Sequence, residues 1–438
     1  MTSTASADAV AVAKAFTTDT WTAGIIGLGY VGLPLAVAAA DCGLRVVGFD
    51  ISPDLVASLS AGSSHVDDIS DEVLVEALAA GLEVTADPTR LGACDAVFIC
   101  VPSPLGRNRQ PDLSYIESAA ATVASAAAPG ILISLESTTY PGTTEDLIVP
   151  AIEAAGLQLD RDAFVAFSPE RVNPGGEVAP QAIPKVVGGV TPTSGRVAAA
   201  AYGRLFEAVH VVSSARAAEM AKLLENTYRA VNIALVNEMA QLAHELDIDI
   251  WEVIDAAATK PFGFQAFYPG PGVGGHCIPL DPQFLAWRAR EAKIATRFID
   301  TAEQVNTAMP TYTADRIADV LNGLGLPVSG TPILGVGISY KPNIADDRES
   351  ASIEVLNKLE RRGAHISVLD PVVGAERIAH WGFAAVTADD LGNPAIAVVL
   401  TDHDDIDLAA IADHVGTVFD TRGAYRKRGI DRSNVVTL

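Results

Sequence analysis

One cysteine, Cys277, lies in a segment, residues 267–282, that contains four glycines and four prolines. Glycine lets the backbone take unusual angles and proline fixes φ, so we expect a rigid loop rather than a helix or strand. Such a loop would hold the thiol in one orientation, with Asp281 four residues later. A thiolate is a nucleophile and a carboxylate can direct a water molecule. The alternative is a turn around a buried, inert cysteine.

A nucleotide-binding pattern lies near the N-terminus. An apolar strand ends at Ile26, Gly27, Gly29 and Gly32 form G-x-G-x-x-G, and a helix is expected over residues 33–42. A second strand, residues 45–50, ends on Asp50. These glycines allow a tight turn and close approach to a pyrophosphate, and the acid accepts hydrogen bonds from the adenosine ribose. Since Asp50 would repel a 2′-phosphate, the pattern predicts NAD rather than NADP.

Apolar strands are expected at residues 95–101, 131–135 and 163–167, and ligands bind beyond the carboxyl ends of parallel strands. Thr138 belongs to this rim, or else caps the following helix. Glu170 and Arg171 follow the third strand, with a solvated charge pair as the alternative. The predicted cofactor contacts are Gly27, Gly29, Tyr30, Val31, Gly32, Asp50, Pro102, Ser103 and Thr138.

A long helix is expected over residues 215–246, followed by helices at 250–259, 283–291 and 296–324. Lys222, Asn226 and Arg229 recur at spacings of four and three, so they share one helical face. They either line a pocket or are ordinary surface residues. The apolar faces of this helical region are sufficient for a homodimer or a higher homo-oligomer.

The last third of the chain repeats the opening in outline. Strands are expected at residues 332–337, 365–370, 394–400 and 417–420, without the full glycine motif. We therefore expect a second doubly wound unit that binds a different, mononucleotide ligand. Lys341, Arg348 and Arg422 lie just past strand ends, where they could meet phosphates.

The chain of 438 residues has a net charge of −24 and a mean hydropathy of +0.27. This charge argues against nucleic acid or an anionic membrane as a partner. Cys42, Cys94, Cys100 and Cys277 have neither zinc nor disulfide spacing, so we expect no metal and a cytoplasmic location. No apolar run has the length of a membrane span, and residues 1–20 lack the features of a signal peptide.

The predicted fold class is α/β, with two Rossmann-like, doubly wound parallel-sheet domains joined by a long helical connector. The expected boundaries are a loose tail at 1–20, an NAD-binding domain at 21–213, a helical dimerisation region with the cysteine loop at 214–325, and a second doubly wound, mononucleotide-binding domain at 326–438.

Together these motifs resemble the nucleotide-sugar 6-dehydrogenase family, which includes UDP-glucose and GDP-mannose dehydrogenases. The resemblance extends from about residue 21 to residue 428. It rests on the glycine motif, Ser137-Thr138 with Pro141-Gly142, Ser168-Pro-Glu-Arg171, Lys222-x-x-x-Asn226, Gly274-Gly-His-Cys-Ile-Pro-Leu-Asp281, and Tyr340-Lys341 with Asp347-Arg-Glu-Ser350.

The resemblance implies oxidation of a sugar C6 alcohol to a carboxylate with two NAD, through a thiohemiacetal and a thioester on Cys277. By similarity, Lys222 and Asn226 stabilise oxyanions, Asp281 and Thr138 position water, and Glu170 is a general base. His276 is not expected to be the base. The implied substrate contacts are Glu170, Arg171, Val172, Asn173, Lys222, Asn226, Arg229, Phe267, Tyr268, Gly272, Gly274, Lys341, Arg348 and Arg422.

Within the family, the segment from Ser168 to Gly175 and His276 before the cysteine resemble the subgroup that acts on UDP-N-acetylhexosamines, particularly UDP-N-acetylglucosamine. Lys260 stands near where glucose enzymes place an arginine that reaches a neighbouring subunit. UDP-glucose 6-dehydrogenase is the main alternative. A hydroxyacid dehydrogenase and an NAD-responsive redox sensor are further ones.

Overall fold

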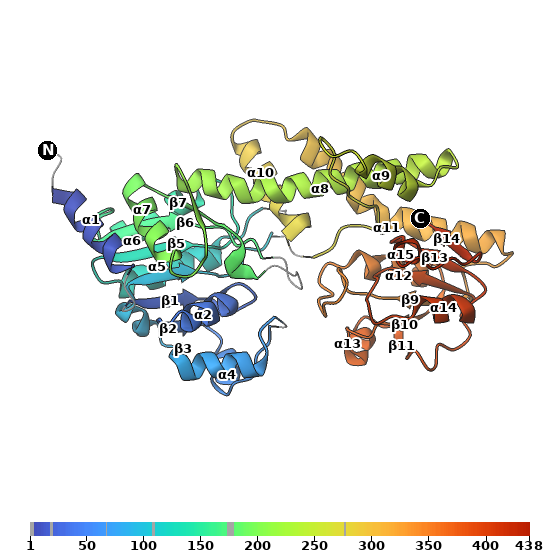
Figure 1. The fold of residues 1–438 in the computed structure, drawn as a ribbon, viewed down its shortest axis with the longest axis horizontal. Coiled ribbons are helices and arrows are strands. Elements are labelled where there is room, and N and C mark those ends of the chain that lie inside the picture. Colours follow the sequence, from blue (N-terminus) through green and yellow to red (C-terminus); the bar gives the residue numbers. More distant parts are fainter. Residues whose placement is uncertain (1–3, 18–20, 67, 107–109, 173–178, 276) are drawn as a thin grey trace. The chain divides into compact units, whose positions relative to one another are not determined.

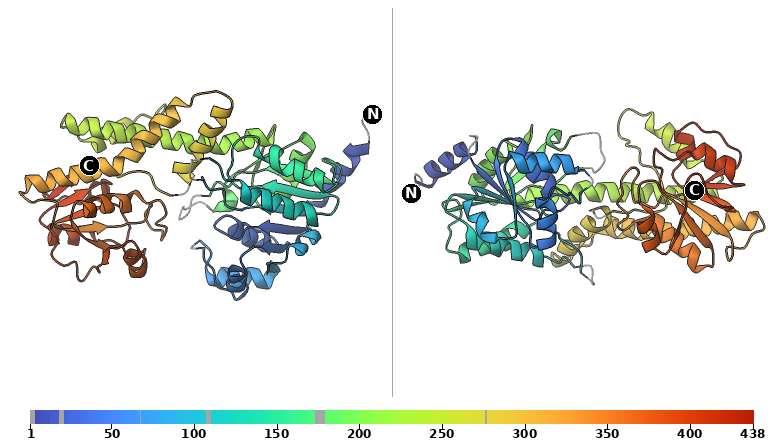
Figure 2. Two further views of the ribbon diagram at one scale, coloured as in Figure 1. Left: turned by 180° about the vertical axis from the view of Figure 1, so that it is seen from behind. Right: turned by 90° about the horizontal axis from the view of Figure 1, so that it is seen from below.

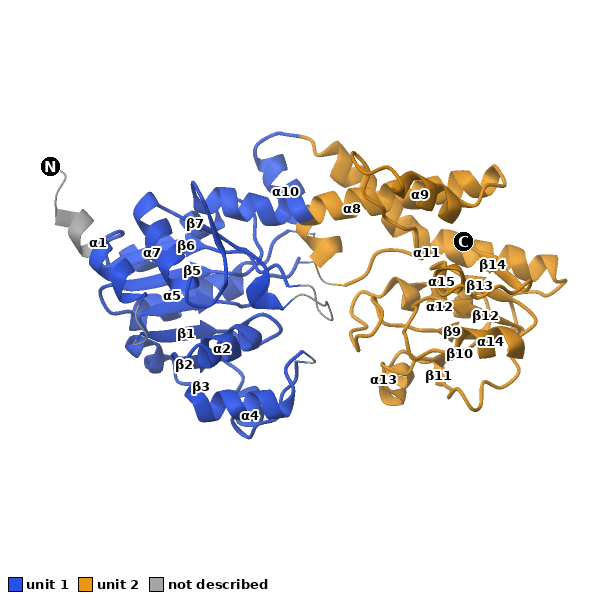
Figure 3. Cartoon of the chain, viewed as in Figure 1, with its two compact units in different colours: residues 1–225, 283–294 blue, residues 226–282, 295–438 orange. Residues whose placement is uncertain are grey.

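The structure, a computed structural model, describes residues 4–17, 21–66, 68–106, 110–172, 179–275 and 277–438. The chain forms two compact units, coloured separately in Figure 3. The first comprises residues 1–225 and 283–294, and the second comprises residues 226–282 and 295–438.

The first unit contains an eight-stranded sheet in the order β3-β2-β1-β4-β5-β6-β7-β8. Neighbouring strands are parallel except for the antiparallel pair β6 and β7. The order reverses between β1 and β4, so the loops after these two strands form the expected nucleotide crevice. The strands are β1 (Thr22–Ile26), β2 (Arg45–Phe49), β3 (Leu82–Thr85), β4 (Ala96–Ile99), β5 (Ile131–Leu135), β6 (Ala163–Phe167), β7 (Lys185–Gly189) and β8 (Val209–Val212).

Both faces of this sheet are buried. Along β4, Ala96 and Phe98 join one hydrophobic core, whereas Val97 and Ile99 join the other. The parallel strands therefore read as continuous apolar runs in the sequence. The helices of this unit, most of them labelled in Figure 1, are α1 (Thr4–Ala15), α2 (Gly32–Asp41), α3 (Pro53–Ser60), α4 (Asp71–Ala80), α5 (Ser114–Ala126), α6 (Val149–Ala154) and α7 (Pro192–Tyr202). Short helical segments lie at Pro88–Ala93, Thr144–Ile148 and Pro180–Ala182.

The N-terminal segment differs from the expected loose tail. Residues 4–15 form α1, and Phe16 is buried with its ring 5.1 Å from that of Trp21. Ala9 on α1 also belongs to the first hydrophobic core. Burial of one aromatic ring and a small-residue helix face is enough to attach a segment whose composition alone predicts no structure.

Four helices lie between the two sheets in the sequence: α8 (Ala215–Glu245), α9 (Ile250–Ala258), α10 (Cys277–Glu291) and α11 (Arg297–Gly323). The expectation of a loop up to Pro282 was wrong, because α10 begins at Cys277. Pro279 lies in the first turn, where a missing N–H costs nothing. Pro282 then removes one internal hydrogen bond without ending the helix.

The second unit contains a six-stranded parallel sheet in the order β11-β10-β9-β12-β13-β14, whose twist is visible in Figure 2. Its strands are β9 (Pro332–Val336), β10 (His365–Leu369), β11 (Ala384–Ala385), β12 (Ile396–Val399), β13 (Val418–Asp420) and β14 (Val435–Thr437). The helices are α12 (Ala351–Arg361), α13 (Ala375–His380), α14 (Leu408–His414) and α15 (Ala424–Lys427). The predicted fold class, two Rossmann-like domains with a long helical connector, is confirmed.

Among the described residues, no helix is both long and apolar enough to cross a membrane.

Candidate functional site

Glycine is found at the three positions after β1 for three different structural reasons. Gly27 has φ of +86°, which favours glycine. A Cβ on Gly32 would lie 1.8 Å from the Gly27 carbonyl oxygen, so only glycine lets α2 begin this close to the strand. A Cβ on Gly29 would meet nothing within 4 Å, which leaves its backbone open to a ligand. This division of roles is the one that dinucleotide binding requires.

Asp50 fixes the same turn. Its Oδ2 accepts from the Leu28 N–H at 3.0 Å and its Oδ1 from the Ser52 N–H at 2.9 Å. Each carboxylate oxygen has a second lone pair, so the half-buried group can still accept from ribose hydroxyls. The residues present thus fit the adenosine side of NAD, for which Asp50 would be the acceptor.

His65 also lies at this corner and was missed in the sequence. Its ring centroid is 6.4 Å from that of the exposed Tyr30. Partial burial lowers the pKa of His65, opposed by the negative charge of Asp50. A lone histidine after two serines carries no local signal, and only the fold brings it to Asp50.

Two hydroxyl groups join the loops that follow β4 and β5. Ser103 Oγ donates to the Thr138 carbonyl at 2.6 Å, and Ser137 Oγ donates to the Val101 carbonyl at 2.6 Å. Thr138 is therefore held on the predicted rim. It is not a helix cap, because the cap position of the next helix belongs to Thr143. Pro102 is exposed beside Ser103.

Glu170 belongs to a buried network of charges rather than to a solvated pair with Arg171. Lys185, which is 3% exposed, donates to Glu136 at 2.8 Å and to Glu170 at 3.2 Å. The other oxygen of Glu170 accepts from the N–H groups of Arg171 and Val172. Lys185 and Glu136 were not predicted as site residues from the sequence.

The pKa shifts in this network follow from burial and charge. Burial opposes ionisation of Glu170, but Lys185 and the two N–H groups outweigh it, so the pKa of Glu170 is lowered. For Glu136 burial outweighs Lys185, and its pKa is raised. Burial disfavours the Lys185 ammonium, yet the two carboxylates hold its pKa above the usual range.

Lys222 is connected to this network through the backbone. Its Nζ donates to the Glu170 carbonyl oxygen at 2.6 Å. The neighbouring Arg171 is engaged by Glu225, with 2.7 Å between Nη2 and Oε1, and by the Pro184 carbonyl at 2.9 Å. Each predicted charged residue in this part of the first unit thus has a defined partner.

In the second unit, the glycines before Cys277 pack against Tyr340. A Cβ on Gly275 would lie 2.8 Å from the tyrosine ring, and a Cβ on Gly274 would lie 2.8 Å from its Cβ. The Gly275 N–H donates to the Arg348 carbonyl at 3.3 Å. Glycine is therefore needed at both positions for close packing against Tyr340.

Cys277 is the first residue of α10 and is exposed. The positive end of the helix dipole favours negative charge at this position, as a thiolate nucleophile requires. Asp281, one turn along α10, is 3% exposed and accepts from the Asn226 side-chain amide. Two of the predicted catalytic residues are thus in direct contact.

The predicted substrate residues of the second unit have mixed surroundings. Arg422 donates to the Leu400 carbonyl at 2.6 Å, and Arg348 pairs with Asp346 at 2.6 Å. Phe267 packs its ring on Tyr228, and Tyr268 packs on Trp251. Gly272 lies close to Ala351. Arg229 is exposed and Lys341 is partly exposed. Asn173 and His276 lie outside the described residues.

Three models of one protein family match the chain in succession. They are the NAD binding domain (residues 22–206), the central domain (216–308) and the UDP binding domain (334–427) of the UDP-glucose/GDP-mannose dehydrogenase family. The chain belongs to this family.

Three similar proteins are named for three different sugars. An NDP-N-acetyl-D-galactosaminuronic acid dehydrogenase of Ralstonia nicotianae is 35% identical over 95% of this chain and 99% of that protein. A UDP-N-acetyl-D-glucosamine 6-dehydrogenase of Pseudomonas aeruginosa is 35% identical over 81% of this chain and 84% of its own. The structure of a UDP-D-ManNAc dehydrogenase from Pyrococcus horikoshii has a TM-score of 0.85, 30% identity, and coverage of 95% and 98%.

As a member of the UDP-glucose/GDP-mannose dehydrogenase family, the protein is an NAD-dependent nucleotide-sugar dehydrogenase, an oxidoreductase. This confirms the resemblance, the enzyme class and the cofactor predicted from the sequence. The part of the chain that the structure describes contains no cluster of three or more potential metal ligands.

Proposed function

We propose that the protein oxidises the C6 primary alcohol of a UDP-N-acetylhexosamine, foremost UDP-N-acetylglucosamine, to the uronic acid. The observation that carries the proposal is that three relatives matched over most of their length are named for N-acetylated sugars. The segment that begins at Ser168 resembles the subgroup that acts on N-acetylhexosamines, and Glu225 holds Arg171 of that segment in place. The expected cytoplasmic location stays a prediction.

The proposed reaction at Cys277 consists of two successive oxidations followed by hydrolysis. NAD, when bound, accepts a hydride in each. The alcohol loses a hydride and a proton to give the aldehyde, and the thiolate sulfur then adds to the carbonyl carbon to form a thiohemiacetal. Loss of a second hydride and a proton gives a thioester. Water cleaves the C–S bond and releases the carboxylate and the thiol.

The first-unit contacts support a specific division of roles. The lowered pKa of Glu170 keeps it ionised near neutral pH but makes it a weak base, and both of its oxygens already have donors. We assign Glu170 to holding the Lys222 ammonium through its carbonyl. Lys222 and Asn226, one turn apart on α8, would stabilise oxyanions, and Asp281 would position water.

The sugar is tested by competition between UDP-sugars, with NADH formation as the readout. A site that pairs with an amide leaves polar groups unmatched when glucose binds, and such mismatches cost up to about 10⁴-fold. We expect kcat/KM for UDP-N-acetylglucosamine to exceed that for UDP-glucose by at least about tenfold. The N-acetylgalactosamine and N-acetylmannosamine sugars are the rivals. A value for UDP-glucose equal to that of every N-acetylated sugar would place the protein in the glucose branch.

We further propose that two copies associate through α8. Tyr228, Leu235 and Leu242 recur seven residues apart on the part of α8 in the second unit and are 49%, 53% and 51% exposed. A repeat of seven places these residues along one helical stripe, which a second copy could cover. Sedimentation should show a dimer, and Leu235→Glu should dissociate it. A monomer at micromolar concentration in the unaltered protein would refute the proposal.

A further inference from the structure

The two units use the same turn at the end of their first central strand. In the first unit, the Gly27 N–H donates to the Phe49 carbonyl at 2.9 Å and the Leu28 N–H to Asp50 at 3.0 Å. In the second unit, the Gly337 N–H donates to the Leu369 carbonyl at 2.9 Å, and the Ile338 N–H donates to Asp370 at 2.7 Å. Asp370 is thus the structural counterpart of the ribose acceptor Asp50.

A buried histidine, His403, lies against Asp370. His403 follows β12 and is fully buried, with Nε2 at 3.2 Å from Asp370 Oδ2. Its Nδ1 accepts from the Asn343 N–H at 3.0 Å. An accepting Nδ1 carries no proton, so Nε2 carries it and donates to Asp370. The carboxylate that would face a ribose in the first unit is occupied by the protein itself in the second.

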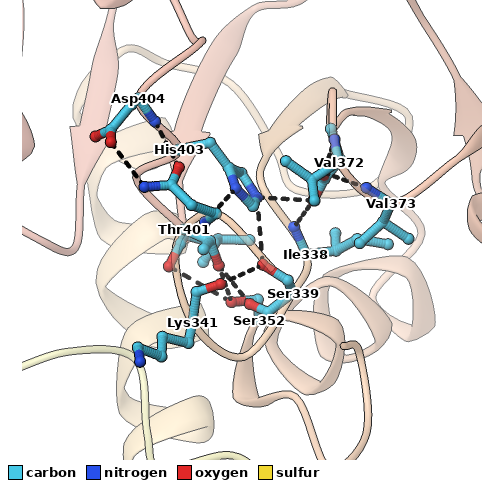
Figure 4. A network of polar contacts seen from close by, with 12 residues as sticks. Ile338, Ser339, Lys341, Ser352, Val372, Val373, Thr401, His403 and Asp404 are labelled. Atoms are coloured by element: carbon cyan, nitrogen blue, oxygen red, sulfur yellow. Dashed lines mark hydrogen bonds and ion pairs between the residues drawn. The ribbon is translucent and has the colours of Figure 1, made fainter. Parts of the chain in front are cut away.

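The same histidine attaches the loop that carries Lys341. The Asn343 side chain donates to Asp404 at 2.7 Å and accepts from the Asp404 N–H at 2.9 Å. Ser339 Oγ lies 3.2 Å from His403 and donates to the Lys341 carbonyl at 2.8 Å. Figure 4 shows these bonds around His403 and the Lys341 side chain directed away from them.

The surrounding charges support a fixed loop. Arg428 donates to the His403 carbonyl at 2.6 Å and pairs with Asp402, so the loop after β12 is itself held. Asn343 has φ of +63°, a conformation that its contacts with His403 and Asp404 stabilise. His403 is therefore one of the contacts that hold the loop 339–343, beside Thr401, which donates to the Ser339 carbonyl at 2.6 Å.

We propose that His403 is a positioning residue for the nucleotide sugar. It closes the ribose acceptor at Asp370, so the second unit does not bind a dinucleotide in the manner of the first, and it fixes the loop from which Lys341 reaches the diphosphate of UDP. The inference rests on the proposed function, because it takes the UDP moiety of the substrate as the ligand of this unit.

The test is UDP binding by calorimetry, with NAD binding and steady-state kinetics measured beside it. His403→Leu removes the side-chain contacts with Asn343, Asp370 and Ser339. UDP binding must then order the released loop again, and at a cost of about 1–3 kcal/mol Kd for UDP should rise about 5- to 150-fold. KM for the UDP-sugar should rise in parallel, while kcat and Kd for NAD stay unchanged. His403→Gln should restore binding, because its amide can accept from Asn343 and donate to Asp370.

His414→Leu is the matched control, since His414 is exposed in the same unit and bonds only to the Gly392 carbonyl among the contacts described. Unchanged UDP affinity in folded His403→Leu would overturn the inference. If His403→Leu does not fold, Asp404→Ala replaces it as the test. Asp404 is exposed, and its loss removes the bond from the Asn343 side chain, so UDP binding should weaken a few-fold. No change there would also overturn the inference. Absence of UDP binding in the unaltered protein would instead refute the proposed function.

Discussion

Cys277→Ala should abolish formation of the sugar acid while leaving the fold and NAD binding intact. Without sulfur no thiohemiacetal forms, so the second oxidation has no covalent substrate. Loss of a nucleophile lowers turnover by orders of magnitude, and we expect acid formation to fall by at least about 10³-fold. Cys277 is an exposed first residue of α10, so stability should change by no more than about 0.5 kcal/mol.

The measurement is NADH and sugar acid produced per UDP-sugar, with Cys42→Ala as the matched control. Cys42 is half-buried in the first unit and has no proposed role. Undiminished production of two NADH per sugar by Cys277→Ala would rule out covalent catalysis.

Alkylation gives an independent check. Burial raises the pKa of Cys94 to about 12 and that of Cys100 well above its usual value, and it also raises the pKa of Cys42. Iodoacetamide near neutral pH should therefore label the exposed Cys277 first and inactivate the enzyme. Mass spectrometry of the labelled peptides would show the order.

The features predicted well from the sequence are those whose cause is local. Gly27 and Gly32 are required by the backbone of one turn, and the apolar strands are buried on both faces, so each leaves a pattern in a short window. The 31-residue helix α8 was predicted to within one residue at its C-terminal end, because its apolar spacing is sustained.

The features that were missed depend on distant partners. Lys185 is the first residue of β7, and a single lysine at a strand end is normally predicted to be exposed. Its partner Glu136 lies 49 residues away in the sequence. His403 contacts Asp370, which is 33 residues away. The helix start at Cys277 was missed because prolines mask it, although proline is tolerated in a first turn. Periodicity contains none of this information.

Lys185→Met should strongly destabilise the first unit. It keeps the length of the side chain but leaves the buried Glu136 and the half-buried Glu170 without a cation. Breaking a buried ion pair from one side costs about 3–5 kcal/mol. The Tyr202 hydroxyl, which donates to Glu136 at 2.6 Å, is too weak a donor to replace an ammonium group.

The loss should depend on pH in a defined direction. In the unaltered protein Glu170 has a lowered pKa, so its stabilising contribution is present above the unfolded value of about 4.3 and is lost as pH falls through the folded value. Without Lys185 the pKa of both carboxyls should rise in the folded state. At pH 8 the folded protein must then either ionise them without a cation or keep protons that the unfolded chain releases. The difference in unfolding free energy between variant and parent should therefore be larger at pH 8 than at pH 5.

Removing one carboxylate should return part of the stability, and this makes the prediction specific to charge. Glu136→Gln with Lys185→Met leaves Glu170 alone with its two backbone donors and replaces the fully buried charge by a neutral amide that still accepts from Tyr202. We expect the double variant to be more stable than Lys185→Met alone. Lys14→Met, at an exposed lysine of the same unit, is the control. Denaturant unfolding, with hydrogen exchange of the β5 and β7 amides as a local probe, would decide. Equal loss in the single and double variants would mean that Lys185 acts by packing rather than by its charge.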